Sequence, residues 1–316
     1  MRKFLLVVAM VIVSLNFGCV SSMLTNGQIR ATRRASTVFG TIGDYEVARG
    51  AVFGGLVQME GMHRLAPDNE DALYMLTQAW VGYGFAFAED DMDVAIDAGN
   101  DALADYHKER AKMAYERAVG YGLELLSHDG GVLTPANRRN AATMKAWLVE
   151  NFDDKEDAPN LFWTGYGMMA RTALLRDQPE VVAELFIGVA MVERSVELDP
   201  EFLRHTGTLA LAAYHARSGF AEMAEGKRLF EDTLAKTQRK SLVVQLNYAK
   251  TYACLKVDRK LYESLLNEIL AAGDLDPEQR LNNTIAKRRA KRLLGKDRMM
   301  NCGFDMSAPP TAQTAP

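Results

Sequence analysis

The sequence predicts an all-α protein built from helical hairpins packed into a compact solenoid. Two observations support this prediction. Alternating β-branched runs bounded by turns are absent after residue 20, whereas Ala, Leu, Glu, Arg and Met are abundant. Apolar residues also recur at helical spacing between capping and turn signals along most of the chain.

The clearest hairpin spans residues 180–219. One face of its first helix carries Val182, Leu185, Phe186, Val189, Val192 and Val196, and one face of its second carries Phe202, Leu209, Ala210, Ala213 and Tyr214. We expect Asp199 and Pro200 to end the first helix and cap the second. The hairpin resembles a degenerate tetratricopeptide unit. Because such a unit leaves an apolar face uncovered, further hairpins are expected.

Further helices are expected on both sides of this hairpin. They run over Tyr45–Leu65, Asp71 to about Glu89, Asp101–Leu126, Pro135 to about Asn151, Asn160–Arg176, Glu222–Ala235, Lys240–Leu255, Lys260–Ala272 and Pro277–Leu294. Residues 41–300 are therefore predicted to form one tetratricopeptide-like domain. Residues 19–40 are expected to be a tether that becomes helical near Gln28, and residues 301–316 a disordered tail.

The first 18 residues are typical of a secretory signal peptide. Two cations precede an apolar run, Phe4–Leu15, that is too short to span a bilayer comfortably. Gly18-Cys19 then resembles a bacterial lipobox, although Asn16 and Phe17 depart from its usual pattern. We expect a fatty-acyl (palmitate) anchor at Cys19; a plain cleaved signal or an uncleaved anchor is the alternative. Val20 after the cysteine favours the outer membrane, facing the periplasm.

Charge excludes some functions and leaves two clusters to explain. The net charge of −4 argues against binding nucleic acid. The acids Glu89, Asp90, Asp91, Asp93 and Asp97 lack the pattern of an EF-hand, so a solvated loop and helix start are expected. The cations Lys287, Arg288, Arg289, Lys291 and Arg292 are expected on a solvated capping face; contact with anionic lipid headgroups is the alternative.

The cysteines other than Cys19 allow two interpretations. Cys254 and Cys302 could form a disulfide that ties the C-terminus to a helix. The sequence favours two unpaired cysteines, with Cys254 buried in an apolar helix, because spacing alone does not show that the geometry fits.

Two helices combine aromatic residues with glycines and are the candidates for a ligand cavity. The candidates are Trp80, Gly82, Tyr83, Phe87, Trp163, Tyr166, Gly167 and Met169. The aromatic side chains would wall the cavity, and the glycines would make room for the ligand. The alternative is an ordinary aromatic core with tight helix packing.

Catalytic chemistry is not indicated by any motif. The five histidines are scattered, and no H-E-x-x-H, G-x-S-x-G, Walker loop or dinucleotide fingerprint occurs. The sequence therefore predicts no enzyme, no cofactor and no metal site.

Several short motifs together resemble the T component associated with TRAP transporters. They are Gly18-Cys19, A-P-D-N at 66–69, M-A-Y-E-R-A at 113–118, V-E-R-S-V-E-L-D-P-E-F at 192–202 and A-K-R-R-A-K-R-L-L at 286–294. The resemblance implies a periplasm-facing lipoprotein that forms homotrimers and pairs with the periplasmic solute-binding (P) component. It also implies a cleft for a small hydrophobic ligand. The alternative is a scaffold lipoprotein for envelope protein assembly.

Overall fold

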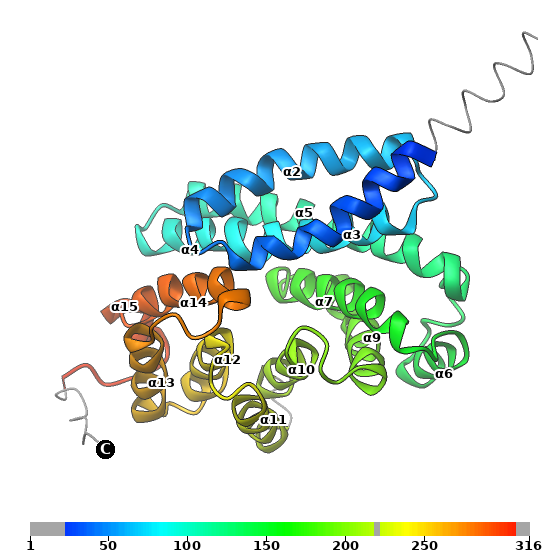
Figure 1. Ribbon diagram of the computed structural model, residues 1–316. Helices are drawn as coiled ribbons and strands as arrows, with labels where there is room; N and C mark the ends of the chain where they lie inside the picture. The colour runs from blue at the N-terminus through cyan, green and yellow to red at the C-terminus, as the bar shows by residue number, and fades with distance from the viewer. Residues whose placement is uncertain (1–22, 218–221, 308–316) are drawn as a thin grey trace, which may run out of the picture.

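The structure, a computed structural model, describes residues 23–217 and 222–307, and every regular element within these ranges is a helix (Figure 1). The all-α prediction is confirmed. In chain order the helices are residues 23–35, η1 (Ser36–Thr41), α2 (Tyr45–Leu65), α3 (Glu70–Tyr83), η2 (Gly84–Ala88), α4 (Glu89–Asp97), α5 (Asp101–Gly130), α6 (Ala141–Asn151), η3 (Lys155–Asp157), α7 (Ala158–Leu174), α8 (Pro179–Val182), α9 (Leu185–Leu198), α10 (Thr206–Arg217), α11 (Met223–Lys236), α12 (Leu242–Asn247), η4 (Tyr248–Ala253), α13 (Arg259–Ala271), η5 (Pro277–Gln279), α14 (Arg280–Leu293) and α15 (Lys296–Asn301).

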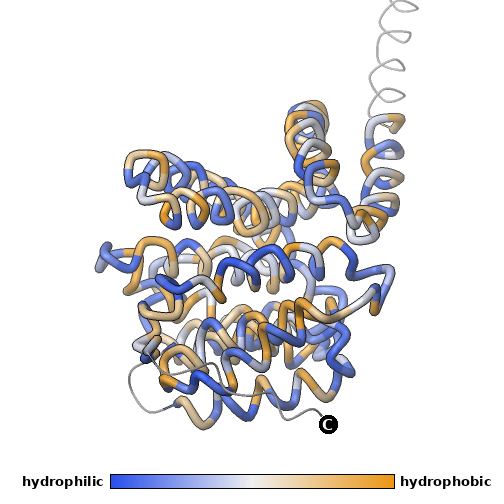
Figure 2. Tube along the Cα trace, turned by 90° about the vertical axis from the view of Figure 1, so that its left-hand side faces the viewer, coloured by the Kyte–Doolittle hydropathy of each residue, from blue (hydrophilic) through white to orange (hydrophobic). Residues whose placement is uncertain are grey.

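Successive helices pack as hairpins, with α3 against α2 and α5, and α7 against α5 and α9. The closest crossing joins α7 to α9. A Cβ added at Gly165 would lie 2.7 Å from the carbonyl oxygen of Gly188, and one added at Gly188 would lie 2.8 Å from that of Gly165. The two backbones therefore touch only because both positions lack a side chain. Hydrophilic and hydrophobic residues alternate along the helices (Figure 2), as expected when each helix buries one side.

The turn after α9 differs from the prediction. Asp199-Pro200 ends α9, but the next helix, α10, begins only at Thr206. Leu203, Arg204 and His205 adopt left-handed backbone angles, with φ of 44°, 55° and 63°. The Nδ1 atom of His205 lies 2.7 Å from the carbonyl oxygen of Pro200. This contact belongs to the turn, and the regular hydrogen bonds of α10 begin after it.

The solenoid closes on itself. Helix α14 packs against η1 and α2, and η5 packs against η1, so the last hairpin meets the first (Figure 1). The Thr284 hydroxyl donates to the carbonyl oxygen of Gly43 at 3.0 Å. Leu281 and Ile285 of α14 are buried in the same apolar cluster as Tyr45 of α2. The predicted solvated capping face is therefore wrong for the part of α14 that the N-terminal helices cover, whereas Lys291 is exposed as predicted.

The N-terminal segment joins the folded part earlier than predicted. Residues 23–35, expected as part of the tether, form a helix whose Ile29 is fully buried against Met62 of α2 and Ala72 of α3. The Asn69 amide also donates to Asn26 at 2.8 Å. The predicted signal peptide, residues 1–18, and the predicted anchor at Cys19 lie outside the described residues.

The C-terminal segment is also ordered further than predicted. Cys254 and Cys302 form a disulfide across 48 residues, with their Cα atoms 4.9 Å apart. The prediction of unpaired cysteines is therefore wrong; helix packing brings together residues whose spacing alone did not show that they meet.

Phe304 is buried with its ring 5.0 Å from that of Tyr262. The predicted disordered tail can thus begin no earlier than residue 308, and residues 308–316 lie outside the described residues. No helix among the described residues is both long and apolar enough to cross a bilayer.

Candidate functional site

The aromatic side chains of α3 point toward α2 and α5. Trp80 donates its indole N–H to Glu60 of α2 at 2.9 Å, and the Tyr83 ring meets Phe53 of α2 edge-on at 5.6 Å. Gly82 has no neighbouring atom within 4 Å of an added Cβ. Trp80 and Tyr83 therefore form part of the packed layer between α3 and its neighbours, whereas Gly82 borders open space.

The remaining candidates also make packing contacts. Phe87 is buried with its ring 5.2 Å from that of Tyr45. An added Cβ at Gly167 would lie 3.2 Å from Val81, so this glycine lets α7 approach α3. Met169 packs where α7 crosses α9.

Two candidates on α7 lie between apolar clusters. Trp163 and Tyr166 each contact both the cluster of α2, α3 and α5 and that of α7, α9 and α10. Burial raises the pKa of the Tyr166 hydroxyl to about 12. Glu89 adds to this rise, whereas the charges of Arg289 and Arg217 oppose it. The hydroxyl of Tyr166 therefore lies near a cluster of charged side chains. The cavity walled by aromatic residues stays a prediction.

One carboxylate organises that charged centre. Asp90, at the start of α4, is fully buried. It forms an ion pair with Arg288 at 2.6 Å, a second with Arg292, and lies 3.5 Å from Arg289, all on α14. Burial alone would raise the pKa of Asp90, but hydrogen bonds from Arg292 and Arg288 and the charge of Arg289 hold it below its usual value. The cluster joins α4 to a helix about 200 residues further along the chain.

The cluster continues toward the C-terminus. Arg298 of α15 pairs with Asp97 at 2.5 Å and with Asp93 at 3.2 Å, and Arg292 also lies 3.6 Å from Asp97. The prediction of solvated acids at 89–97 is therefore wrong for Asp90, and that of solvated cations at 287–292 is wrong for Arg289 and for the partly buried Arg288 and Arg292. The two groups form ion pairs with each other across the closure, and no pattern within either segment showed this.

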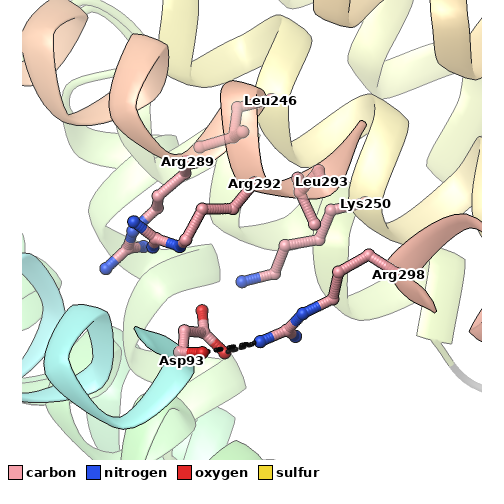
Figure 3. A pocket seen from close by; sticks show the side chains of 7 residues that line it. All are labelled: Asp93, Leu246, Lys250, Arg289, Arg292, Leu293 and Arg298. Atoms are coloured by element: carbon pink, nitrogen blue, oxygen red, sulfur yellow. Dashed lines mark hydrogen bonds and ion pairs between the residues drawn. The ribbon is translucent and has the colours of Figure 1, made fainter. Parts of the chain in front are cut away.

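A small cavity lies beside these ion pairs. Its volume is about 20 Å³, room for one or two water-sized groups. Its lining consists of Asp93, Leu246, Lys250, Arg289, Arg292, Leu293 and Arg298 (Figure 3). Four of these side chains are cations and one is an anion, so the cavity favours negative charge.

Lys250 is the distinctive member of this lining. It lies on the π-helical segment η4, and Figure 3 shows its ammonium group extending between Arg292 and Arg298. Among the described residues it makes no hydrogen bond or ion pair. Burial lowers the pKa of Lys250 to about 8, with the nearby charges of Arg289 and Arg217 acting in the same direction.

A second π-helical segment, η2, also contacts the charged cluster. The Tyr115 hydroxyl donates to Glu89, directly after η2, at 2.5 Å. Gly84 makes room for the Tyr115 ring, because an added Cβ would lie 2.8 Å from it. Arg289 donates to the carbonyl oxygen of Phe85 and lies 4.4 Å above its ring. Both π-helical segments thus flank the same centre, and such segments are frequent at functional sites.

A further surface feature lies on α2. Its exposed face carries Val47, Val57 and Leu65, which are 58%, 75% and 74% exposed. Gly50 and Gly54 lie on the same face, with open space around them. These residues form an exposed apolar stripe along α2.

These features define a class: an all-α ring of helical hairpins that closes around a charged centre. Within the described residues no group of His, Cys, Asp and Glu could hold a metal ion. Residues 43–300 match the family described as TRAP transporter T-component. The match covers most of the chain, so the chain belongs to this family. A search of curated proteins finds no match.

Family membership fixes the general role. The chain is an accessory component of a TRAP transporter and associates with such a transport system. The family is one of transport components and not of enzymes. The resemblance identified from the short motifs is confirmed.

Proposed function

We propose that this chain is a periplasm-facing lipoprotein that binds a small hydrophobic organic ligand on behalf of a TRAP permease, and that it pairs with the periplasmic solute-binding (P) component. The observation that carries the proposal is the closed ring around a lined centre, in a chain of the T-component family. A ring that packs its ends together encloses its centre, and the cavity there, of about 20 Å³, admits one or two water-sized groups.

The membrane attachment belongs to the same proposal. A lipid at Cys19 would hold the chain at the outer membrane. The supporting features are the apolar run before Gly18-Cys19 and Val20 after it. The disulfide between Cys254 and Cys302 supports an oxidising compartment such as the periplasm.

Association with other chains completes the proposal. A homotrimer and a complex with the solute-binding component both need an apolar contact surface, and the exposed face of α2 supports such a contact. The same face would also serve the alternative function, a scaffold for envelope protein assembly that carries no small ligand.

Native mass spectrometry of the full chain in mild detergent tests the proposal, combined with capture by a tagged solute-binding component. We expect a trimer that carries a small molecule or retains the solute-binding component. A monomer with neither would contradict transport and favour the scaffold.

The Gly82→Leu variant extends the same experiment to the aromatic candidates. Because Gly82 has open space around it, this variant should fold. Loss of the small molecule from a folded trimer would place the ligand beside Trp80 and Tyr83. Unchanged occupancy would mean that those residues serve packing alone.

A further inference from the structure

The centre of the ring holds a positive charge without a partner. Lys250 makes no ion pair with a described residue, and its neighbours Arg289, Arg292 and Arg298 are cations as well. A buried charge is normally paired or neutralised because removal from water is costly. An unpaired lysine at the cavity is therefore a cost that a bound anion would remove.

Arg289 offers a second unused donor at the same cavity. Its side chain is buried, and its Nε lies 3.5 Å from Asp90 but makes no hydrogen bond. The other cations of the lining are committed, since Arg292 pairs with Asp90 and Asp97, and Arg298 with Asp93 and Asp97.

Counting the charged groups of the cluster and those that act on Lys250, six cations face four carboxylates, so two positive charges remain in excess. The cations are Arg217, Arg288, Arg289, Arg292, Arg298 and Lys250, and the carboxylates are Glu89, Asp90, Asp93 and Asp97. The excess falls on the side chains with unused donors, which is where an anion would bind.

We propose that Lys250 and Arg289 bind the carboxylate head group of a small amphipathic ligand at the centre of the ring. A carboxylate has two oxygens that accept hydrogen bonds, and Lys250 and Arg289 both line the cavity. The cavity has room for a group of that size, and Leu246 and Leu293 are the apolar part of its lining. This inference rests on the proposed ligand-binding function and names the polar end of that ligand.

Isothermal titration calorimetry on the full chain in lipid nanodiscs tests the inference, with octanoate, octanamide and acetate as probes. Octanamide has the size of octanoate without its charge. We expect octanamide to bind about ten- to a hundred-fold more weakly, because a charge-assisted hydrogen bond is lost. Acetate distinguishes two sources of the same head group: comparable affinity for acetate indicates a short organic acid, and weak binding indicates an acid with an apolar chain.

The matched variants are Lys250→Met and Lys256→Met. Both remove one lysine from the same segment of the chain, but Lys256 is exposed. We expect Lys250→Met to weaken octanoate binding by the same ten- to a hundred-fold and to leave octanamide binding unchanged. Lys256→Met should bind both probes like the wild type. Thermal unfolding confirms that each variant is folded.

The pH dependence of octanoate binding gives a second readout. Octanoate is ionised throughout the range from pH 7 to 9.5. Facing Lys250 are Arg289, Arg292 and Arg298, the more distant Arg217, and the carboxylates Asp93 and Glu89. Lys250, with its pKa of about 8, loses its proton, so affinity should fall above pH 8 in the wild type but not in Lys250→Met.

Two results would overturn the inference and leave the proposed function standing. One is equal affinity for octanoate and octanamide with no effect of Lys250→Met, which would mean an apolar site without a head-group contact. The other is no binding of either probe by a chain whose trimer still carries its own small molecule in native mass spectrometry.

Discussion

Two charged regions of the ring share helix α14 and differ in one respect. At the closure, the buried Asp90 is surrounded by Arg288, Arg292 and Arg289 and is fully paired. At the adjoining cavity, which shares Arg289 and Arg292 with the closure, Lys250 has no partner among the described residues. The comparison separates two uses of buried charge: paired charges hold helices together, whereas an unpaired charge is available to a ligand.

The largest expected effect is on the closure. Asp90→Asn leaves three arginines without their shared carboxylate, so we expect a loss of about 3–5 kcal/mol in the free energy of unfolding, on the order of 10 °C in Tm. Thermal unfolding measures this. Asp274→Asn is the control, since Asp274 pairs with Arg280 at the surface and its loss should leave Tm unchanged. Equal effects of the two variants would mean that the closure is held by apolar contacts alone.

The pH dependence of the closure follows from the same pair. The lowered pKa of Asp90 contributes stability that is present above the ordinary aspartate pKa of about 4 and is lost as the pH falls through the lower, folded value. The wild type should therefore lose Tm below pH 4 more steeply than Asp90→Asn does.

A slightly smaller effect is expected at the disulfide. Cys302→Ser opens a loop of 48 residues and should cost up to about 4 kcal/mol if the unfolded chain is otherwise unstructured. The bond joins the end of η4, which carries Lys250, to the end of α15, near Arg298. We therefore expect weaker octanoate binding in calorimetry as well as a lower Tm. Unchanged binding with a lower Tm would show that the disulfide supports the fold without positioning the cavity.

The smallest expected effect is a gain in the free energy of unfolding. Lys250→Met removes an unpaired charge from a partly buried position and should raise the free energy of unfolding by about 1–3 kcal/mol at pH 7 without ligand. Because the Lys250 pKa is about 8 when folded and near 10.5 when unfolded, the wild type regains this stability as the pH rises from 8 to 10.5. The advantage of the variant in thermal unfolding should therefore shrink at pH 10. A destabilised variant at pH 7 would mean that Lys250 is satisfied in the free protein.

Local signals predicted the helices well, and long-range contacts escaped them. Helix α2 runs from Tyr45 to Leu65 as predicted, and α5 begins at Asp101, because Asp44 and Asn100 cap them with their own side chains. The pairing of Asp90 with Arg288 spans 198 residues, and neither segment alone specifies the other. The Cys254–Cys302 bond depends on the same kind of contact.

The candidate site was found only in part. The pattern of aromatic residues predicted Tyr166, and the charges of Glu89, Arg289 and Arg217 do act on the pKa of its hydroxyl. The sequence patterns did not indicate Lys250, although it is the only charged residue in the stretch Val243–Leu255. A lone cation on an otherwise apolar helix is a signal that sequence reading could have used.

The closed ring also bears on the order in which the chain folds. An open solenoid can nucleate anywhere and grow from neighbour to neighbour. Here the first helices find their full set of partners only after α14 has been synthesised, nearly 200 residues after Asp90. Such distant contacts form slowly because a long loop must close first. Until then η1 and α2 present an uncovered face, so any factor that accompanies the unfinished chain would meet the N-terminal hairpin before the ring excludes it.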